Sequence, residues 1–250
     1  MKRLVLLVVV LALANMQTFA SLSDGLVAFW SFDGTNAVDN SGNGHTGIAF
    51  GSPTRTPGIF GDAFGLHDGK SSIWIPPSNA FALTNNLTVG AWINYNSVTS
   101  STFGSQILWF GDPAPAHDPW EIHLLHDGTA QFRVDCGTGN QTVVVNSSGP
   151  LAPHRWYFVA ATESTTGNLK TLRLYINGSL NASLETNVFV HYDLGNMSAE
   201  IGAVDHGTWQ ILDGDIDLPF VYNRALTAGE IAEISSSGTS AINPTRHPIP

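Results

Sequence analysis

The stretch GDIDLPFVYNRALTAGEI, residues 214–231, decides the fold. Residues 212–222 alternate polar and apolar side chains as a β-strand does, and residues 223–226 then turn the chain. Thr227 and Glu230 have the T-x-x-E spacing of a capping box, which satisfies two backbone donors at the start of a helix. The stretch therefore predicts a strand that leads through a short turn into a short amphipathic helix.

Short segments with strand character recur along the rest of the chain, with turn residues between them. Asn177-Gly178 is the strongest turn signal, because both residues tolerate a positive φ. No long amphipathic helix interrupts the pattern, so we expect an all-β fold: a two-sheet antiparallel β-sandwich of the jelly-roll type with a short C-terminal helix. The expected strands are 26–32, 63–67, 72–75, 87–95, 106–110, 120–125, 129–135, 141–146, 155–163, 171–176, 179–186, 199–203 and 210–222.

Further motifs resemble those of the laminin-G-like family and follow one another in the order that they have in that family. The family has a concanavalin A-like lectin/glucanase fold. The closing stretch resembles the last motif of that family. The others are GLVAFWSFDG (25–34), DNSGNGHTG (39–47), TVGAWINY (88–95), HRWYFVAAT (154–162) and LRLYINGSL (172–180). The resemblance covers about residues 24–235 and implies the sandwich fold, which lectins, adhesion modules and enzymes share.

The first twenty residues have the parts of a secretory signal peptide. Lys2 and Arg3 precede an apolar run, residues 4–13, and Thr18-Phe19-Ala20 offers a cleavage site. The apolar run is too short to span a membrane. We therefore expect a secreted protein without a membrane span, made of a signal peptide (1–20), one laminin-G-like domain (21–235) and a flexible tail (236–250).

The composition limits the kinds of partner. The formal net charge is −10, charged residues make up 12% of the chain, and Lys70 and Lys170 are the only lysines after the signal peptide. Nucleic acid is therefore not an expected partner, because its recognition needs clustered cations. The expected partner is a glycan or an extracellular protein. Cys136 is the only cysteine, so the chain forms no internal disulfide, and a structural role is expected for this thiol.

The family resemblance implies a structural calcium ion between the first loop and the last strand. Carboxylate, amide and hydroxyl oxygens are the ligands that calcium prefers. The alternative is that Asp39 and Asn43 bind their own backbone in Asx turns. The candidate ligands are Asp33, Asp39, Ser41, Asn43 and Asp217.

Tryptophans outside the family pattern are the candidates for sugar stacking, since an exposed indole can cover the apolar face of a pyranose. Trp209 is the strongest of them, because Asp205 and His206 in the same loop could bind sugar hydroxyls. The alternative for each tryptophan is a place in the core. The other candidates for the ligand site are Trp74, Trp109, Trp120 and Glu121.

Catalysis has little support in the sequence. Related glycosidases need two carboxylates close together on one strand face, and their E-x-D-x-x-E pattern is absent. Glu121 is the one carboxylate to suspect, with His123, Asp127 or His206 as its helper. The sequence thus favours a non-catalytic carbohydrate-binding or adhesion module over a protein–protein interaction module, and both over a polysaccharide-cleaving enzyme.

Overall fold

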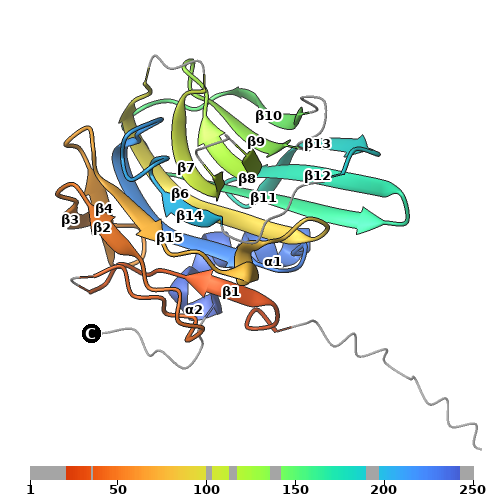
Figure 1. Cartoon of the computed structure of the whole chain (residues 1–250), viewed down its shortest axis with the longest axis horizontal. Coiled ribbons are helices and arrows are strands. Elements are labelled where there is room, and N and C mark those ends of the chain that lie inside the picture. The colour runs from red at the N-terminus through yellow and green to blue at the C-terminus, as the bar shows by residue number, and fades with distance from the viewer. Residues whose placement is uncertain are drawn as a thin grey trace, which may run out of the picture.

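The computed structural model describes residues 21–34, 36–99, 103–112, 117–135, 142–189 and 197–242. Two antiparallel sheets face each other as a sandwich (Figure 1), so the expected fold class is confirmed. Sheet A has the order β13-β12-β11-β6-β15-β4-β3, with β1 also paired to β15, and sheet B has the order β10-β9-β8-β7-β14-β5-β2. Sheet A contains β1 (Leu26–Phe29), β3 (Thr54–Pro57), β4 (Asp62–Leu66), β6 (Leu87–Ser97), β11 (Tyr157–Thr166), β12 (Leu169–Ile176), β13 (Ser179–Thr186) and β15 (Asp213–Tyr222). Sheet B contains β2 (Ile48–Phe50), β5 (Ser72–Ile75), β7 (Ser105–Asp112), β8 (His117–Leu124), β9 (Thr129–Asp135), β10 (Thr142–Pro150) and β14 (Ser198–Ile201).

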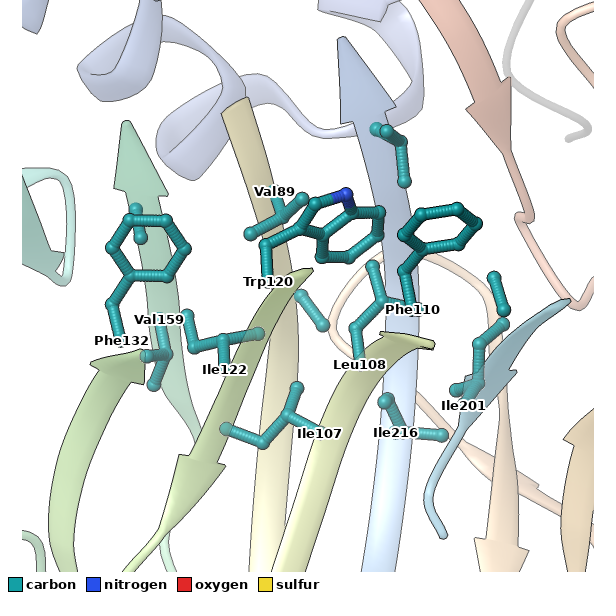
Figure 2. Packing of buried hydrophobic residues seen from close by; sticks show 14 of the residues in the cluster. Val89, Ile107, Leu108, Phe110, Trp120, Ile122, Phe132, Val159, Ile201 and Ile216 are labelled. Atoms are coloured by element: carbon teal, nitrogen blue, oxygen red, sulfur yellow. The ribbon is translucent and has the colours of Figure 1, made fainter. Parts of the chain in front are cut away.

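The main core lies between the two sheets. Alternate residues of each strand point inward, and Figure 2 shows Phe110, Trp120 and Phe132 of sheet B packed toward Val89 and Val159 of sheet A. The rings of Phe110 and Trp120 are stacked with their centroids 5.4 Å apart. The outer face of sheet B, on the side away from the core, is therefore available for a ligand site.

Strand β15 pairs with β6 along one edge, and on its other edge it changes partner at Pro219, where the sequence departs from its alternating pattern. Proline has no N–H to donate, so an edge or a bulge is expected there. The register with β6 shifts between Asp217 and Phe220, and Leu218 has a φ of 51°. This bulge confirms the expectation. Before it β15 pairs with β4, and after it β15 pairs with β1.

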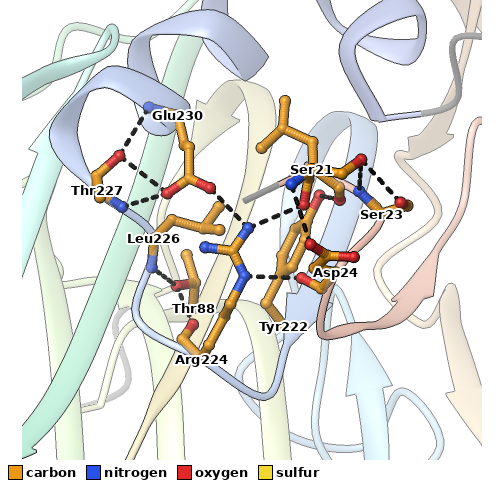
Figure 3. Close-up of polar contacts among 10 residues, drawn as sticks. Ser21, Ser23, Asp24, Thr88, Tyr222, Arg224, Leu226, Thr227 and Glu230 are labelled. Carbon is orange, nitrogen blue, oxygen red and sulfur yellow. Dashed lines mark hydrogen bonds and ion pairs between the residues drawn. The ribbon is translucent and has the colours of Figure 1, made fainter. Parts of the chain in front are cut away.

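The capping box is present as the sequence predicts (Figure 3). The Glu230 N–H donates to Thr227 Oγ1, and the Thr227 N–H donates to a carboxylate oxygen of Glu230. Arg224 donates to the other Glu230 oxygen at 2.6 Å and to the Asp24 carbonyl at 2.7 Å. The Tyr222 hydroxyl donates to the Leu22 carbonyl, 200 residues away in sequence. The two ends of the domain are thus tied together.

Two strands were missed and several boundaries differ. Strands β2 and β3 are short, exposed edge strands, and their segments lack a clear alternation. The first strand ends at Phe29 instead of Phe32, and the φ of 54° at Phe32 is incompatible with an extended strand at that residue. The last strand begins at Asp213 instead of 210, because residues 202–212 form a separate hairpin.

The helical end of the domain is longer than expected. A 3₁₀ turn (Asn79–Phe81) lies earlier in the chain, and helices α1 (Ala228–Ser237) and α2 (Thr239–Ile242) follow β15. The prediction of a flexible tail from residue 236 is therefore wrong for 236–242, since Ile242 is buried in a second core under sheet A. The segments 1–20 and 243–250 lie outside the described residues. None of the helices in the described ranges has the length and hydrophobicity needed to cross a bilayer.

Candidate functional site

A hairpin between β14 and β15, residues 204–209, carries the three best ligand candidates of the sequence. Val204 and Trp209 form an isolated antiparallel bridge at its base. At its tip, Asp205 and His206 have φ values of 56° and 57°. The bridge encloses four residues, and the Thr208 N–H donates to the Asp205 carbonyl at 3.2 Å, so His206 and Gly207, both with positive φ, are the central residues of the turn. The structure therefore places Asp205, His206 and Trp209 on one tight hairpin.

The hairpin packs against aromatic side chains on the outer face of sheet B. The His206 ring lies 4.5 Å from the Phe50 ring on β2 and 5.2 Å from the Trp74 ring on β5. Trp74 was one of the sequence candidates, whereas Phe50 was missed because β2 was not recognised as a strand. We call Phe50, Trp74, His206 and Trp209 the aromatic surface.

Trp209 is the most exposed large apolar side chain among the described residues, with 62% of its surface accessible. It follows His206 by three residues, which span at most about 10 Å of chain. Asp205 lies between the bridge and His206 and is also partly exposed. Trp209, His206 and Asp205 are thus side chains of the 204–209 hairpin that solvent can reach.

Three other candidates are not accessible. Trp120 is fully buried in the core, where its indole N–H donates to the Phe81 carbonyl at 3.1 Å. Trp109 lies on the outer face of sheet B but is covered, and its indole N–H donates to Asp118 at 2.7 Å. Glu121 is 1% exposed. The prediction that these residues contact a ligand is therefore wrong.

Glu121 belongs instead to a buried polar cluster on the outer face of sheet B. One of its oxygens accepts from Arg133 at 2.7 Å, and the other accepts from the Gln106 amide. Arg133 also approaches Asp118 at 3.5 Å and Asp135 at 3.4 Å. The sequence missed Asp118 and Arg133, because the cross-strand register that joins them to Glu121 is not encoded in a local motif.

The residues suspected of assisting Glu121 in catalysis have surroundings that do not suit this role. His123 Nδ1 lies 3.7 Å from a Glu121 oxygen, and burial lowers the pKa of His123. Asp127 is exposed and accepts from the Thr129 N–H in its own turn. Burial raises the pKa of Asp118 to about 6, Glu121 adds to this rise, and Arg133 opposes it.

The candidate calcium ligands fall into two groups. In the first loop, the Asp39 carboxylate accepts from the N–H groups of Phe29, Ser41 and His45. The Ser41 hydroxyl and the Asn43 amide donate to backbone carbonyls of β1. These contacts fit the alternative interpretation, in which the loop binds its own backbone. In the described part of the chain, no three His, Cys, Asp or Glu side chains converge in a way that could hold a metal.

Asp33 and Asp217 form the second group and fit a cation better. Asp217 is fully buried; one oxygen accepts from the Ile59 and Phe60 N–H groups, and Oδ1 has no hydrogen-bond partner. Burial raises the pKa of Asp217 to about 7, and the nearby Asp33 carboxylate adds to the rise. A Cβ on Gly61 would lie 2.1 Å from Asp33 Oδ1, so the loop can enclose these carboxylates only with glycine there.

Comparison with known protein families establishes the family of the chain. A family model of the concanavalin A-like lectin/glucanases superfamily, Laminin_G_3, matches residues 67–232, so the chain belongs to this family. The resemblance expected from the motifs is thereby confirmed. No curated protein matches the sequence with significance.

Several solved structures share the fold at low sequence identity. Domain 4 of AbnA, a GH43 extracellular arabinanase from Geobacillus stearothermophilus in complex with arabinotriose, has a TM-score of 0.64 and 22% identity over 84% of this chain and 98% of that one. The binding domain of botulinum neurotoxin DC in complex with SialylT has a TM-score of 0.67 and 18% identity over 87% of this chain. The binding domain of Paraclostridial Mosquitocidal Protein 1 has a TM-score of 0.65 and 19% identity over 87% of this chain. The chain matches about half of each toxin domain, 52% and 53% respectively. At these identities the similarity shows the fold alone.

Proposed function

We propose that the protein is a secreted, non-catalytic module that binds a glycan at the 204–209 hairpin. The observation that carries the proposal is the exposed Trp209 on the same hairpin as His206, whose ring contacts Phe50 and Trp74. Aromatic faces stack on the apolar faces of sugars, and a few polar groups fix the orientation. Glycan complexes of the arabinanase domain and of the neurotoxin binding domain, which share the fold, support this proposal.

The glycan we propose is a single uncharged chain. The net charge of −10 and the partly exposed Asp205 carboxylate disfavour an acidic sugar. The rings are also not coplanar: Phe50 and Trp74 are inclined at 88° and Trp74 and His206 at 45°. Such a surface suits a separate oligosaccharide better than the flat face of a crystalline polysaccharide.

The test is a glycan array that holds neutral, sialylated and uronic acid-containing oligosaccharides. We expect binding to neutral glycans and a loss of about 30-fold for Trp209→Ala, which corresponds to about 2 kcal/mol for an aromatic anchor. The matched control is Phe103→Ala, because Phe103 is also exposed, at 52%, and its ring contacts Arg133 of β9. Binding that survives Trp209→Ala and is lost in Phe103→Ala would move the site to Phe103 and Arg133, elsewhere on the outer face of sheet B.

An extracellular protein is the second candidate ligand. It is favoured by another neurotoxin DC binding-domain structure, which is in complex with rat synaptotagmin II. No signal on any glycan of the array would favour this candidate over the glycan.

The absence of catalysis is part of the proposal. Glu121, the suspected carboxylate, is held by Arg133 and Gln106 and is 1% exposed, and a general acid must reach the bond that it protonates. We therefore expect no release of reducing ends from a panel of polysaccharides. Release that is abolished by Glu121→Gln in a folded protein would show that the module is an enzyme.

We also propose a structural calcium ion, held by Asp33 and Asp217 with backbone carbonyls of the surrounding loops. The buried, unpartnered Asp217 Oδ1 supports this site. An ion that binds only the folded state stabilises it by about 2.7 kcal/mol at a concentration of 100 times Kd.

Saturating calcium is therefore expected to raise the thermal unfolding midpoint above that measured with a chelator. Asp217→Asn should remove this difference, whereas the control Asp39→Asn should keep it, because the Asp39 oxygens already accept backbone N–H groups. Equal midpoints for the unmodified protein with calcium and with chelator would exclude the site.

A further inference from the structure

The 204–209 hairpin has a backbone that needs support. Asp205 and His206 are left-handed with φ values of 56° and 57°, Gly207 follows at 77°, and Gln210 has a φ of 52°. Residues other than glycine adopt this region at a cost and persist there only when the surroundings hold them. The sequence around the tip is polar and short, so the hairpin has no core of its own. Its conformation must be fixed by contacts with sheet B.

Glu200 supplies the contact at the tip. Its side chain rises from β14 on the outer face of sheet B and is fully buried beneath the hairpin. One carboxylate oxygen accepts from the His206 N–H at 3.0 Å, and the other accepts from the Gly207 N–H at 2.9 Å. Hydrogen bonds to a charged acceptor are roughly twice as strong as those between neutral groups. Both carboxylate oxygens are therefore used to hold two consecutive backbone amides.

The tip of the hairpin packs closely against the loop that contains Lys70. A Cβ on Gly207 would lie 2.1 Å from the Lys70 carbonyl, so glycine is needed there for close approach as well as for its positive φ. The contacts at the base of the hairpin are separate: Gln106 donates to the Gln210 carbonyl, and Leu212 donates to the Gly202 carbonyl. These contacts fix the base, and they leave the position of the tip to Glu200 and Gly207.

The position of the tip decides whether the aromatic surface exists. The His206 N–H is bound by Glu200, and the His206 ring lies on Phe50 and Trp74. Trp209 is joined to Val204 across the same hairpin. A tip released from Glu200 would separate the His206 imidazole from the two sheet rings, while Trp209 would stay at the base of the hairpin, so the four aromatic side chains would no longer be held together.

We infer that Glu200 is a positioning residue for ligand binding: its buried carboxylate holds the 204–209 hairpin so that His206 and Trp209 form one surface with Phe50 and Trp74. Glu200 itself does not touch the ligand, because it is fully buried. This inference rests on the proposed glycan-binding function of the same surface.

The test combines amide hydrogen exchange with the glycan array on the full chain. In Glu200→Gln one of the two acceptor oxygens is replaced by an amide NH₂, which cannot accept. We expect the His206 and Gly207 amides to exchange at least about tenfold faster and array signals on neutral glycans to fall at least about tenfold, while thermal unfolding stays cooperative. The matched control Glu185→Gln changes an exposed glutamate of β13 and should alter neither measurement.

A second variant covers the case in which Glu200→Gln does not fold. Gly207→Ala displaces the tip from the Lys70 carbonyl and leaves Glu200 intact, and it should produce the same two changes. Unchanged amide exchange in both variants would overturn the inference, as would faster exchange with undiminished array signals. An unmodified protein that binds nothing on the array would instead refute the proposed function, and the inference would fall with it.

Discussion

Replacing Lys170 by methionine is expected to lower the free energy of unfolding by about 3–5 kcal/mol, the usual cost of breaking a buried ion pair. Lys170 and Glu163 are both fully buried, on β12 and β11, and form an ion pair. Lys170 also donates to the Thr84 carbonyl at 2.9 Å. Without the ammonium group the Glu163 carboxylate would be left in the core with no opposite charge. Urea denaturation monitored by tryptophan fluorescence measures the loss.

The size of this loss should depend on pH. Burial raises the pKa of Glu163 to about 7 in the folded protein, from an ordinary value of 4.5, although Lys170 opposes the rise. In Lys170→Met the folded pKa must lie still higher. A raised folded pKa means that stability is retained below the unfolded pKa and is lost as the pH rises through the folded value. The variant should therefore be less destabilised at about pH 5 than at about pH 8.

A double variant provides the control for this prediction. Lys170→Met combined with Glu163→Leu removes both charges, and we expect it to recover most of the lost stability, because a well-packed apolar pair can replace a buried ion pair at little cost. A double variant as unstable as Lys170→Met would show that packing around the lysine stem, and not the unpaired carboxylate, caused the loss.

Replacing Trp120 by alanine is expected to cost about 3–5 kcal/mol of stability, as for other large-to-small changes in a core. The indole is fully buried and stacks on Phe110 (Figure 2), and its N–H donates to the Phe81 carbonyl. Trp120→Phe keeps the stacking and loses only the polar contact and part of the volume, so its cost should be clearly smaller.

Trp120→Phe and Trp209→Ala together separate an effect on stability from an effect on binding. Trp120→Phe should bind neutral glycans as the unmodified protein does, whereas Trp209→Ala should lose binding with a stability change within about 0.5 kcal/mol, typical of a surface substitution. A Trp120→Phe variant that folds normally and no longer binds neutral glycans would show that Trp120 belongs to the ligand site.

Local chemistry explains which parts of the fold could be predicted from the sequence. The capping box of Thr227 and Glu230 is confirmed because its donors and acceptors lie within one helical turn. The bulge at Pro219 is confirmed because a missing N–H has the same consequence in any sheet. The two-sheet sandwich followed from the spacing of strands and turns, which needs no knowledge of strand order.

The side chains of the proposed site were harder to predict, because their proximity depends on the register between distant strands. Phe50, Trp74 and Glu200 come from β2, β5 and β14, and pairing of these strands brings them under one hairpin. Trp120 was assigned to a ligand although its neighbour Glu121 lies on the opposite face. Alternation in a strand separates the two faces, but it does not say which of them is covered by the other sheet.

The tie between the two ends of the domain also constrains the order of folding. Strand β1 pairs with β15, and the Tyr222 hydroxyl reaches Leu22 across 200 residues. Closing contacts of such long range costs more loop entropy than closing local contacts, and this slows folding. During synthesis the segment of β1 emerges early and has no strand to join until the segment of β15 has followed. An incomplete chain therefore lacks the contacts that join the two ends of the domain.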